Sequence, residues 1–178
     1  MDRFVMRRIA ALAVAWLLAF GGTAFSDETC NSPYISKLIK GQEDYVYVWV
    51  LGVEGLGDGS DKLVTVDASP KSKSYGKVID AVSTGARVEA HHMGFTDDRR
   101  HIWAGGLSDN RIWVFDIATD PAKPKLAQTI TDLGDKSGYL GPHTYYALPG
   151  RMLVQALSNT KDKGGQTGMA LYNNKGQF

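Results

Sequence analysis

The sequence predicts an all-β fold, made of the four-stranded antiparallel blades of a β-propeller. Short runs of β-branched and aromatic residues alternate with turn residues, and the 178 residues include 20 glycines. One strand pattern also recurs. Residues 63–67, followed by Pro70, match residues 112–116, followed by Pro121, and residues 169–173 are a weaker third copy. Four strands in each repeat of about 50 residues is typical of propeller blades.

Residues 1–26 have the pattern of a secretory signal peptide. Three arginines near the start precede an apolar core at residues 9–20, and Ala24-Phe25-Ser26 forms a small-x-small cleavage site. An uncleaved membrane anchor is the alternative, but the apolar core is short for a span. We therefore expect export, most naturally to a bacterial periplasm.

Residues 27–43 are polar and lack clear periodicity, so we expect them to form a leader before the first strand. This segment contains Cys30, the one cysteine of the chain, so no internal disulfide can form. A metal-binding or redox role for this thiol is the alternative to an incidental one. We favour the incidental role because no neighbouring residue would lower its pKa.

Residues 44–178 form the predicted propeller region, in which each strand is bounded by turn residues. We interpret it as the end of one blade, one whole blade and most of a third. The expected strands are residues 45–51, 63–67, 77–82, 90–95, 101–105, 111–117, 126–131, 143–148, 152–157 and 169–172.

A propeller needs at least four blades to close around its channel. The repeat accounts for fewer, so we expect an incomplete propeller. A fragment of a longer protein is favoured over an assembly of several chains, because the last strand would otherwise leave an exposed edge.

The overall charge gives no reason to expect an anionic partner. The chain has 20 basic and 19 acidic residues and a net charge of +1. Binding to nucleic acid or to an anionic membrane surface relies on a clear excess of basic residues. We therefore expect neither partner.

Histidines recur at one position of the repeat. His92-Met93-Gly94-Phe95 can be overlaid on His143-Thr144-Tyr145-Tyr146. Because the innermost strand of each blade lines the channel of a propeller, His92 and His143 would meet there as metal ligands. Copper suits imidazole donors and binds most tightly among the divalent ions of its row. The alternative is a structural role, with both histidines hydrogen-bonded at the mouths of their blades.

The neighbours of these histidines are weaker candidates. His91 would face away from His92 in a regular strand, so both could bind one metal only if the strand bulges or ends there. Glu89 would share a face with His91 in an extended strand and could orient a ligand imidazole; a solvated loop glutamate is an equal alternative. His101 is away from the repeated position, so we expect a structural or surface role. Tyr145 is a secondary candidate for the channel lining.

From about Asp44 to the C-terminus, the sequence resembles the selenium-binding protein / methanethiol oxidase family in the order, spacing and identity of its motifs. The matching features are residues 63–67 with Pro70-Lys71-Ser72, Tyr75 before Lys77-Val78-Ile79, Glu-x-His-His-x-Gly at 89–94, residues 111–116, residues 121–126, His143-Thr144 and Lys163-Gly164-Gly165.

The resemblance implies a β-propeller enzyme, periplasmic and copper-dependent in bacteria, that oxidises methanethiol with O2 to formaldehyde, hydrogen sulfide and hydrogen peroxide. It also implies a longer protein, of which this chain carries the N-terminal blades. A family cysteine linked to selenium binding would fall where Gly76 stands, so selenium binding through that thiol is not expected. The alternative function is a non-catalytic propeller that binds a selenium compound, another ligand or a partner protein.

Overall fold

The computed structural model describes residues 32–178, which form three antiparallel sheets and two short helices. The predicted signal peptide and Cys30 lie outside the described residues. Within the described part of the chain, no helix is long and apolar enough to cross a membrane.

The first sheet contains three strands in the order β1-β2-β3. They are β1 (Tyr45–Val50), β2 (Lys62–Asp67) and β3 (Val78–Ser83). Side chains alternate between two faces, as in any strand. Trp49 and Leu63 point inward to the core, while Val46 and Val48 on the other face are exposed.

The second sheet is the one complete four-stranded blade among residues 32–178. It is a meander in the order β4-β5-β6-β7, with β4 (Ala90–Phe95), β5 (His101–Gly106), β6 (Arg111–Asp116) and β7 (Lys125–Ile130). The central strands β5 and β6 are buried on both faces, because this sheet lies between the other two.

The third sheet has the order β8-β9-β10, with β8 (Tyr139–Leu148), β9 (Arg151–Asn159) and β10 (Met169–Asn173). All ten expected strands are therefore confirmed, although β8 begins four residues before the predicted start at His143. The helices α2 (Pro33–Ser36) and α3 (Leu133–Ser137) were not predicted. Helices of four and five residues are too short to show a helical period.

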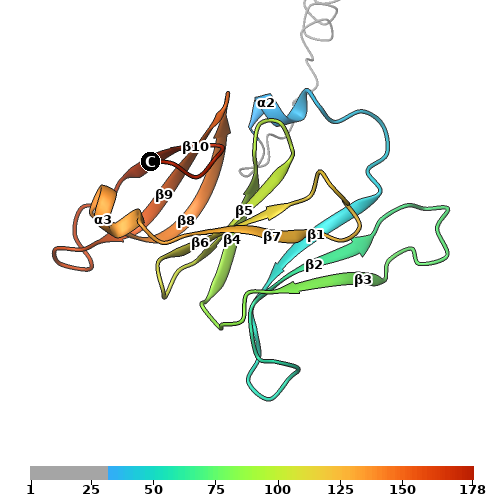
Figure 1. Cartoon of the computed structure of the whole chain (residues 1–178), viewed down its shortest axis with the longest axis horizontal. Helices are drawn as coiled ribbons and strands as arrows, with labels where there is room; N and C mark the ends of the chain where they lie inside the picture. The colour runs from blue at the N-terminus through green and yellow to red at the C-terminus, as the bar shows by residue number, and fades with distance from the viewer. Residues whose placement is uncertain (1–31) are drawn as a thin grey trace, which may run out of the picture.

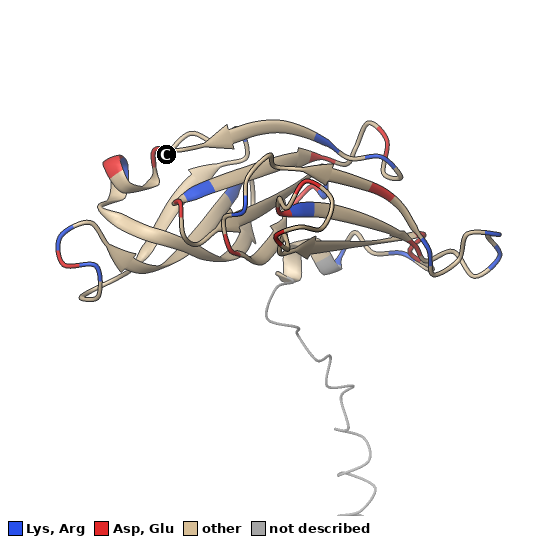
Figure 2. Cartoon of the chain, turned by 90° about the horizontal axis from the view of Figure 1, so that it is seen from below, with Lys and Arg blue, Asp and Glu red and all other residues tan. Residues whose placement is uncertain are grey.

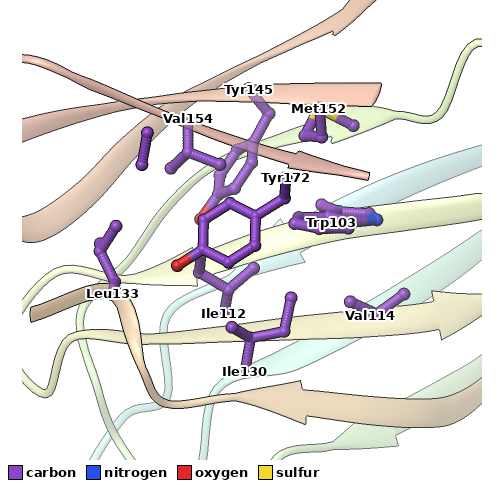
Figure 3. Close-up of a cluster of buried hydrophobic side chains, with 10 residues drawn as sticks. Trp103, Ile112, Val114, Ile130, Leu133, Tyr145, Met152, Val154 and Tyr172 are labelled. Atoms are coloured by element: carbon purple, nitrogen blue, oxygen red, sulfur yellow. The ribbon is translucent and has the colours of Figure 1, made fainter. Parts of the chain in front are cut away.

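Two apolar cores hold the sheets together. The core between the first and second sheets includes Trp49, Leu63, Trp113 and Phe115. Figure 1 shows the four-stranded sheet between the two three-stranded ones. Figure 3 shows the core between the second and third sheets, which is formed by Trp103, Ile112, Val114, Ile130, Leu133, Tyr145, Met152, Val154, Ala170 and Tyr172.

Matching turns identify the equivalent strands. Asp67 and Asp116 cap the turns that follow their strands, since each carboxylate accepts a hydrogen bond from the backbone N–H two residues later. Asn173 accepts one from Lys175 in the same way. Strands β2, β6 and β10 are therefore equivalent. The first sheet corresponds to β5–β7 and the third to β4–β6, which confirms the predicted end of one blade and most of another.

The surface has two distinct features. Figure 2 shows that acidic and basic residues are interspersed along the ribbon, many of them in the loops. The outward faces of the first and third sheets are apolar instead. Their exposed side chains include Val46, Val48 and Val78 on one and Leu157, Met169 and Leu171 on the other.

Candidate metal centre

Strands β4 and β8 approach each other unusually closely because two glycines leave room for Tyr145. A β-carbon at Gly94 would lie 2.7 Å from the Cβ of Tyr145. At Gly105, in the neighbouring strand β5, it would lie 2.4 Å from the hydroxyl of Tyr145 and 2.5 Å from the carbonyl oxygen of Pro142. Such distances exclude any side chain larger than hydrogen unless the strands separate. The equivalent first strands of two successive blades therefore lie side by side.

Both strands are irregular where their histidines lie. The pairing of β4 with β5 shifts register between Ala90 and Met93, and His91 and His92 occupy that interval. The pairing of β8 with β9 shifts between Pro142 and Thr144, which places His143 at the irregularity. A bulge interrupts strict alternation and redirects side chains. The condition stated from the sequence, that β4 must bulge for both neighbouring histidines to face one point, is met.

The three imidazoles form a compact cluster, called the triad below. The ring centroids of His91 and His92 are 4.5 Å apart, those of His91 and His143 are 4.6 Å apart, and those of His92 and His143 are 4.5 Å apart. One nitrogen from each ring lies within 4.8 Å of the others. His91 is exposed, whereas His92 and His143 are partly buried, so the cluster opens to solvent on the His91 side.

The electrostatic environment favours the neutral form of His92. Partial burial lowers the pKa of this imidazole below its ordinary value of 6.5, and repulsion from His143 and His91 lowers it further. A metal ion binds the neutral imidazole rather than the protonated one. The packing of three basic rings therefore keeps a ligand nitrogen available near neutral pH.

His143 is hydrogen-bonded on one side of its ring. Its Nδ1 lies 3.1 Å from Oε1 of Gln155 and 2.8 Å from Oγ1 of Thr144. The Nε2 of Gln155 donates to the carbonyl oxygen of Ala156 at 2.8 Å. Sequence reasoning missed Gln155, because its place beside His143 depends on the pairing of β8 with β9, in which Thr144 faces Gln155.

The triad fits a first-row transition metal. Two nitrogens bound to one ion at about 2.1 Å lie at most about 4.2 Å apart, so the observed 4.8 Å limit is within small ring movements of that spacing. All three donors are imidazoles, which suit copper, zinc, nickel or iron rather than calcium or magnesium. The residues present can therefore hold such an ion.

Glu89 does not have the geometry expected from the sequence. Its φ of 62° lies in the left-handed region, so the assumption of an extended strand shared with His91 is wrong. Glu89 lines an open hollow of about 460 Å³ together with Leu107, Asn110 and Lys163, among others. Among residues 32–178, its carboxylate has no hydrogen bond to an imidazole. An orienting role for Glu89 remains a prediction.

A buried carboxylate supports this unusual backbone. Asp61 is fully buried, and its Oδ2 accepts hydrogen bonds from the N–H groups of Val88 and Ala90, at 3.1 and 2.7 Å, on either side of Glu89. Its Oδ1 accepts from the N–H of Gly52 at 2.7 Å. Asp61 thus fixes the segment that leads into the bulge with His91 and His92.

The other sequence candidates lie apart from the triad. His101 begins β5 beside Asp116 of β6 and is outside the cluster, as expected. Tyr145 is only 1% exposed and belongs to the core between the second and third sheets. It packs against the glycines described above instead of presenting its hydroxyl to the triad.

Stacked blades with three imidazoles at adjoining first strands define a β-propeller protein with a histidine cluster able to hold a metal ion. Comparison with known proteins agrees. A family model described as 56kDa selenium binding protein (SBP56) matches residues 26–178. The chain belongs to this family. It is also similar to the solved structure of a hypothetical selenium-binding protein from Sulfolobus tokodaii, with a TM-score of 0.67 and 28% identity over 74% of this chain and 32% of that one.

Two bacterial relatives are similar over the whole chain. The chain is 58% identical over 178 residues to a methanethiol oxidase from Hyphomicrobium and 53% identical over 179 residues to one from Ruegeria pomeroyi. Selenium-binding protein 2 from Arabidopsis thaliana is 32% identical over 145 residues, which cover 73% of this chain and 30% of that protein. The chain spans 40% of the length of each bacterial relative.

Proposed function

We propose that the chain provides the metal-binding blades of a copper-dependent methanethiol oxidase. The balanced reaction joins one molecule each of methanethiol, O2 and water and yields one each of formaldehyde, hydrogen sulfide and hydrogen peroxide. The observation that carries this proposal is the convergence of His91, His92 and His143, in a chain 58% identical over its whole length to a methanethiol oxidase.

Copper is proposed because of the donor set. Three imidazoles favour a first-row transition metal, and copper has the highest affinity among the divalent ions of that row. When bound, copper supplies a redox-active centre with affinity for sulfur. The three histidines would hold the ion, and the exposed side at His91 leaves access for a small thiol and O2 from solvent.

The remaining residues set the shape and charge of the centre. The lowered pKa of His92 supplies a neutral donor without a neighbouring base. The contact between Gly94 and Tyr145 keeps β4 and β8 at the spacing that brings the imidazoles together. Asp61 holds the entry to the bulge through the N–H groups of Val88 and Ala90. These residues position the ligands and are not proposed to contact the substrate.

We also propose that the protein is exported to the periplasm. The basic start, the apolar core and the cleavage site within residues 1–26 support this location.

Selenium binding without catalysis is the second candidate function, and it is disfavoured at one position. Gly76 occupies the turn between β2 and β3 with a φ of 73°, where the resemblance places a selenium-linked cysteine. Residues 32–178 contain no cysteine. A selenium compound would therefore need a different ligand within the described part of the chain.

Metal analysis of the purified chain tests the proposal. We expect about one copper per chain in the wild type and none in the His91→Ala or His143→Ala variants. His101→Ala is the matched control, because it removes an imidazole outside the triad, and it should retain copper. Copper content that is unchanged by the triad substitutions would overturn the proposed centre.

Turnover is measured separately. Methanethiol should cause O2 uptake and equal release of hydrogen peroxide and hydrogen sulfide in the copper-loaded wild type, with both products lost in the His143→Ala variant. The same substitution in a full-length bacterial relative extends the test to the whole propeller. If the unsubstituted relative binds stoichiometric copper but does not turn over methanethiol, the result would support the binding function and overturn the oxidase function.

A further inference from the structure

The geometry points to Gln155 as the positioning residue that selects which nitrogen of His143 faces the metal. The Gln155 side chain accepts a hydrogen bond from Nδ1–H of His143. The lone pair on Nε2 of His143 is then available to a metal held with His91 and His92. This inference rests on the proposed metal centre, but the state of the imidazole is a property of the metal-free protein and can be measured there.

The orientation of the Gln155 amide carries the argument. Its Nε2 donates to the carbonyl oxygen of Ala156 at 2.8 Å, which can only accept. The amide oxygen is therefore the atom that lies 3.1 Å from Nδ1 of His143. An amide oxygen is only an acceptor, so a hydrogen bond between these atoms requires a proton on Nδ1. The neutral imidazole then has its lone pair on Nε2.

Thr144 does not determine the tautomer by itself. Its hydroxyl lies 2.8 Å from the same Nδ1 and can either donate or accept. If the hydroxyl donated, Nδ1 would be unprotonated and its lone pair would face Oε1 of Gln155 at 3.1 Å. That repulsion is avoided when Thr144 accepts a share of the Nδ1–H. Gln155 therefore determines the tautomer of His143, and the Thr144 hydroxyl takes the acceptor role.

The strand geometry explains why Gln155 is available. The register shift between Pro142 and Thr144 pairs Thr144 directly with Gln155 across β8 and β9. The glutamine side chain is therefore beside His143, at the irregularity in β8. Among residues 32–178, His91 and His92 have no comparable hydrogen bond, so His143 is the anchored imidazole of the triad.

The consequence is an ordered ligand set. The hydrogen bond made by one ring nitrogen determines which nitrogen binds a metal. Anchoring Nδ1 of His143 gives the centre one ligand of fixed orientation. His91 and His92 can then bind the same ion by small movements of their rings. Loss of such a partner typically lowers metal affinity by about 10- to 100-fold.

The first test is the tautomer of His143 in the metal-free, ¹⁵N-labelled chain, from long-range ¹H–¹⁵N correlations above the imidazole pKa. We expect the Nδ1–H form in the wild type and in Thr144→Val. Gln155→Leu should lose that preference, and Gln155→Glu, which keeps an acceptor, should restore it. An Nε2–H form in the wild type would overturn the inference, even if Gln155→Leu failed to fold.

The second test is copper affinity by competition with a chelator of known affinity. Gln155→Leu should raise the copper Kd by about 10- to 100-fold, and Gln155→Glu should bring it within a few-fold of the wild type. An unchanged Kd in folded Gln155→Leu would overturn the positioning role. Absence of copper binding in a wild type that shows the Nδ1–H form would instead remove the proposed function and leave the assignment of the tautomer intact.

Discussion

Gly94 of β4 and Tyr145 of β8 are in such close contact that a β-carbon at residue 94 would lie 2.7 Å from the Cβ of Tyr145. The contact joins the second and third sheets two residues beyond His92 in one strand and two beyond His143 in the other. It therefore sets the distance between triad histidines that come from different blades.

Replacing this glycine should weaken both the fold and the metal centre. Gly94→Ala forces β4 and β8 apart, and we expect a loss of about 1–3 kcal/mol in the free energy of unfolding, measured by urea denaturation, together with weaker copper binding. Gly164→Ala is the control, because a β-carbon there meets only one atom, at 4.0 Å. Equal stability of the two variants would contradict the prediction.

His92 should titrate below an ordinary histidine. Burial first, and then the neighbouring imidazoles, lower its pKa from 6.5, so NMR titration should place its midpoint below that value. The unfolded chain then binds this proton at higher pH than the folded chain. Stability should therefore fall as the pH drops through 6.5 toward the folded pKa, and level off below it. His143→Asn should raise the midpoint of His92, and a wild-type midpoint at or above 6.5 would contradict this account.

The Asp61 carboxylate should stabilise the backbone of the segment that precedes the triad. In Asp61→Asn, the amide NH2 replaces one oxygen that now accepts backbone hydrogen bonds, and buried N–H groups lose their acceptor. We expect a loss of about 1–3 kcal/mol in unfolding free energy. Asp80→Asn, on the neighbouring strand β3, should change stability by less than about 0.5 kcal/mol. A similar effect at both positions would show that Asp61 has no special role.

The exposed apolar faces should make the chain associate with itself. Val78 is 62% exposed on the first sheet and Met169 is 60% exposed on the third, and such surfaces favour contact with other molecules. Sedimentation should show concentration-dependent oligomers, with a shift toward monomer in Val78→Lys and Met169→Lys. Thr131→Lys controls for added charge. A wild type that is monomeric at all concentrations tested would refute this.

The strands were predictable from sequence because each is a short β-branched or aromatic run bounded by turn residues. The repeat also identified His92 and His143 as equivalent positions that meet. Their meeting depends on propeller geometry, in which successive first strands adjoin. Local pattern and overall architecture agree here, so the sequence alone was sufficient to predict the strands and the meeting of these two histidines.

The details of the site depend on backbone features that a periodic pattern does not contain. Glu89 was expected in an extended strand, but the hydrogen bonds from Asp61 stabilise a left-handed conformation there. Tyr145 is equivalent to Gly94 in the repeat, so the repeat does not indicate where its side chain lies, and it packs into the core because glycines leave room for it. Gln155 reaches His143 only through the shifted register of β8 and β9.

The triad takes two histidines from the second sheet and one from the third. An ion bound to all three would therefore act as a clasp across the boundary between blades. Its binding free energy would be added to the work of separating those sheets, while β1–β3 would gain nothing directly. A bound metal would therefore make the second and third sheets harder to separate by force. The first sheet would then detach before these two sheets separated.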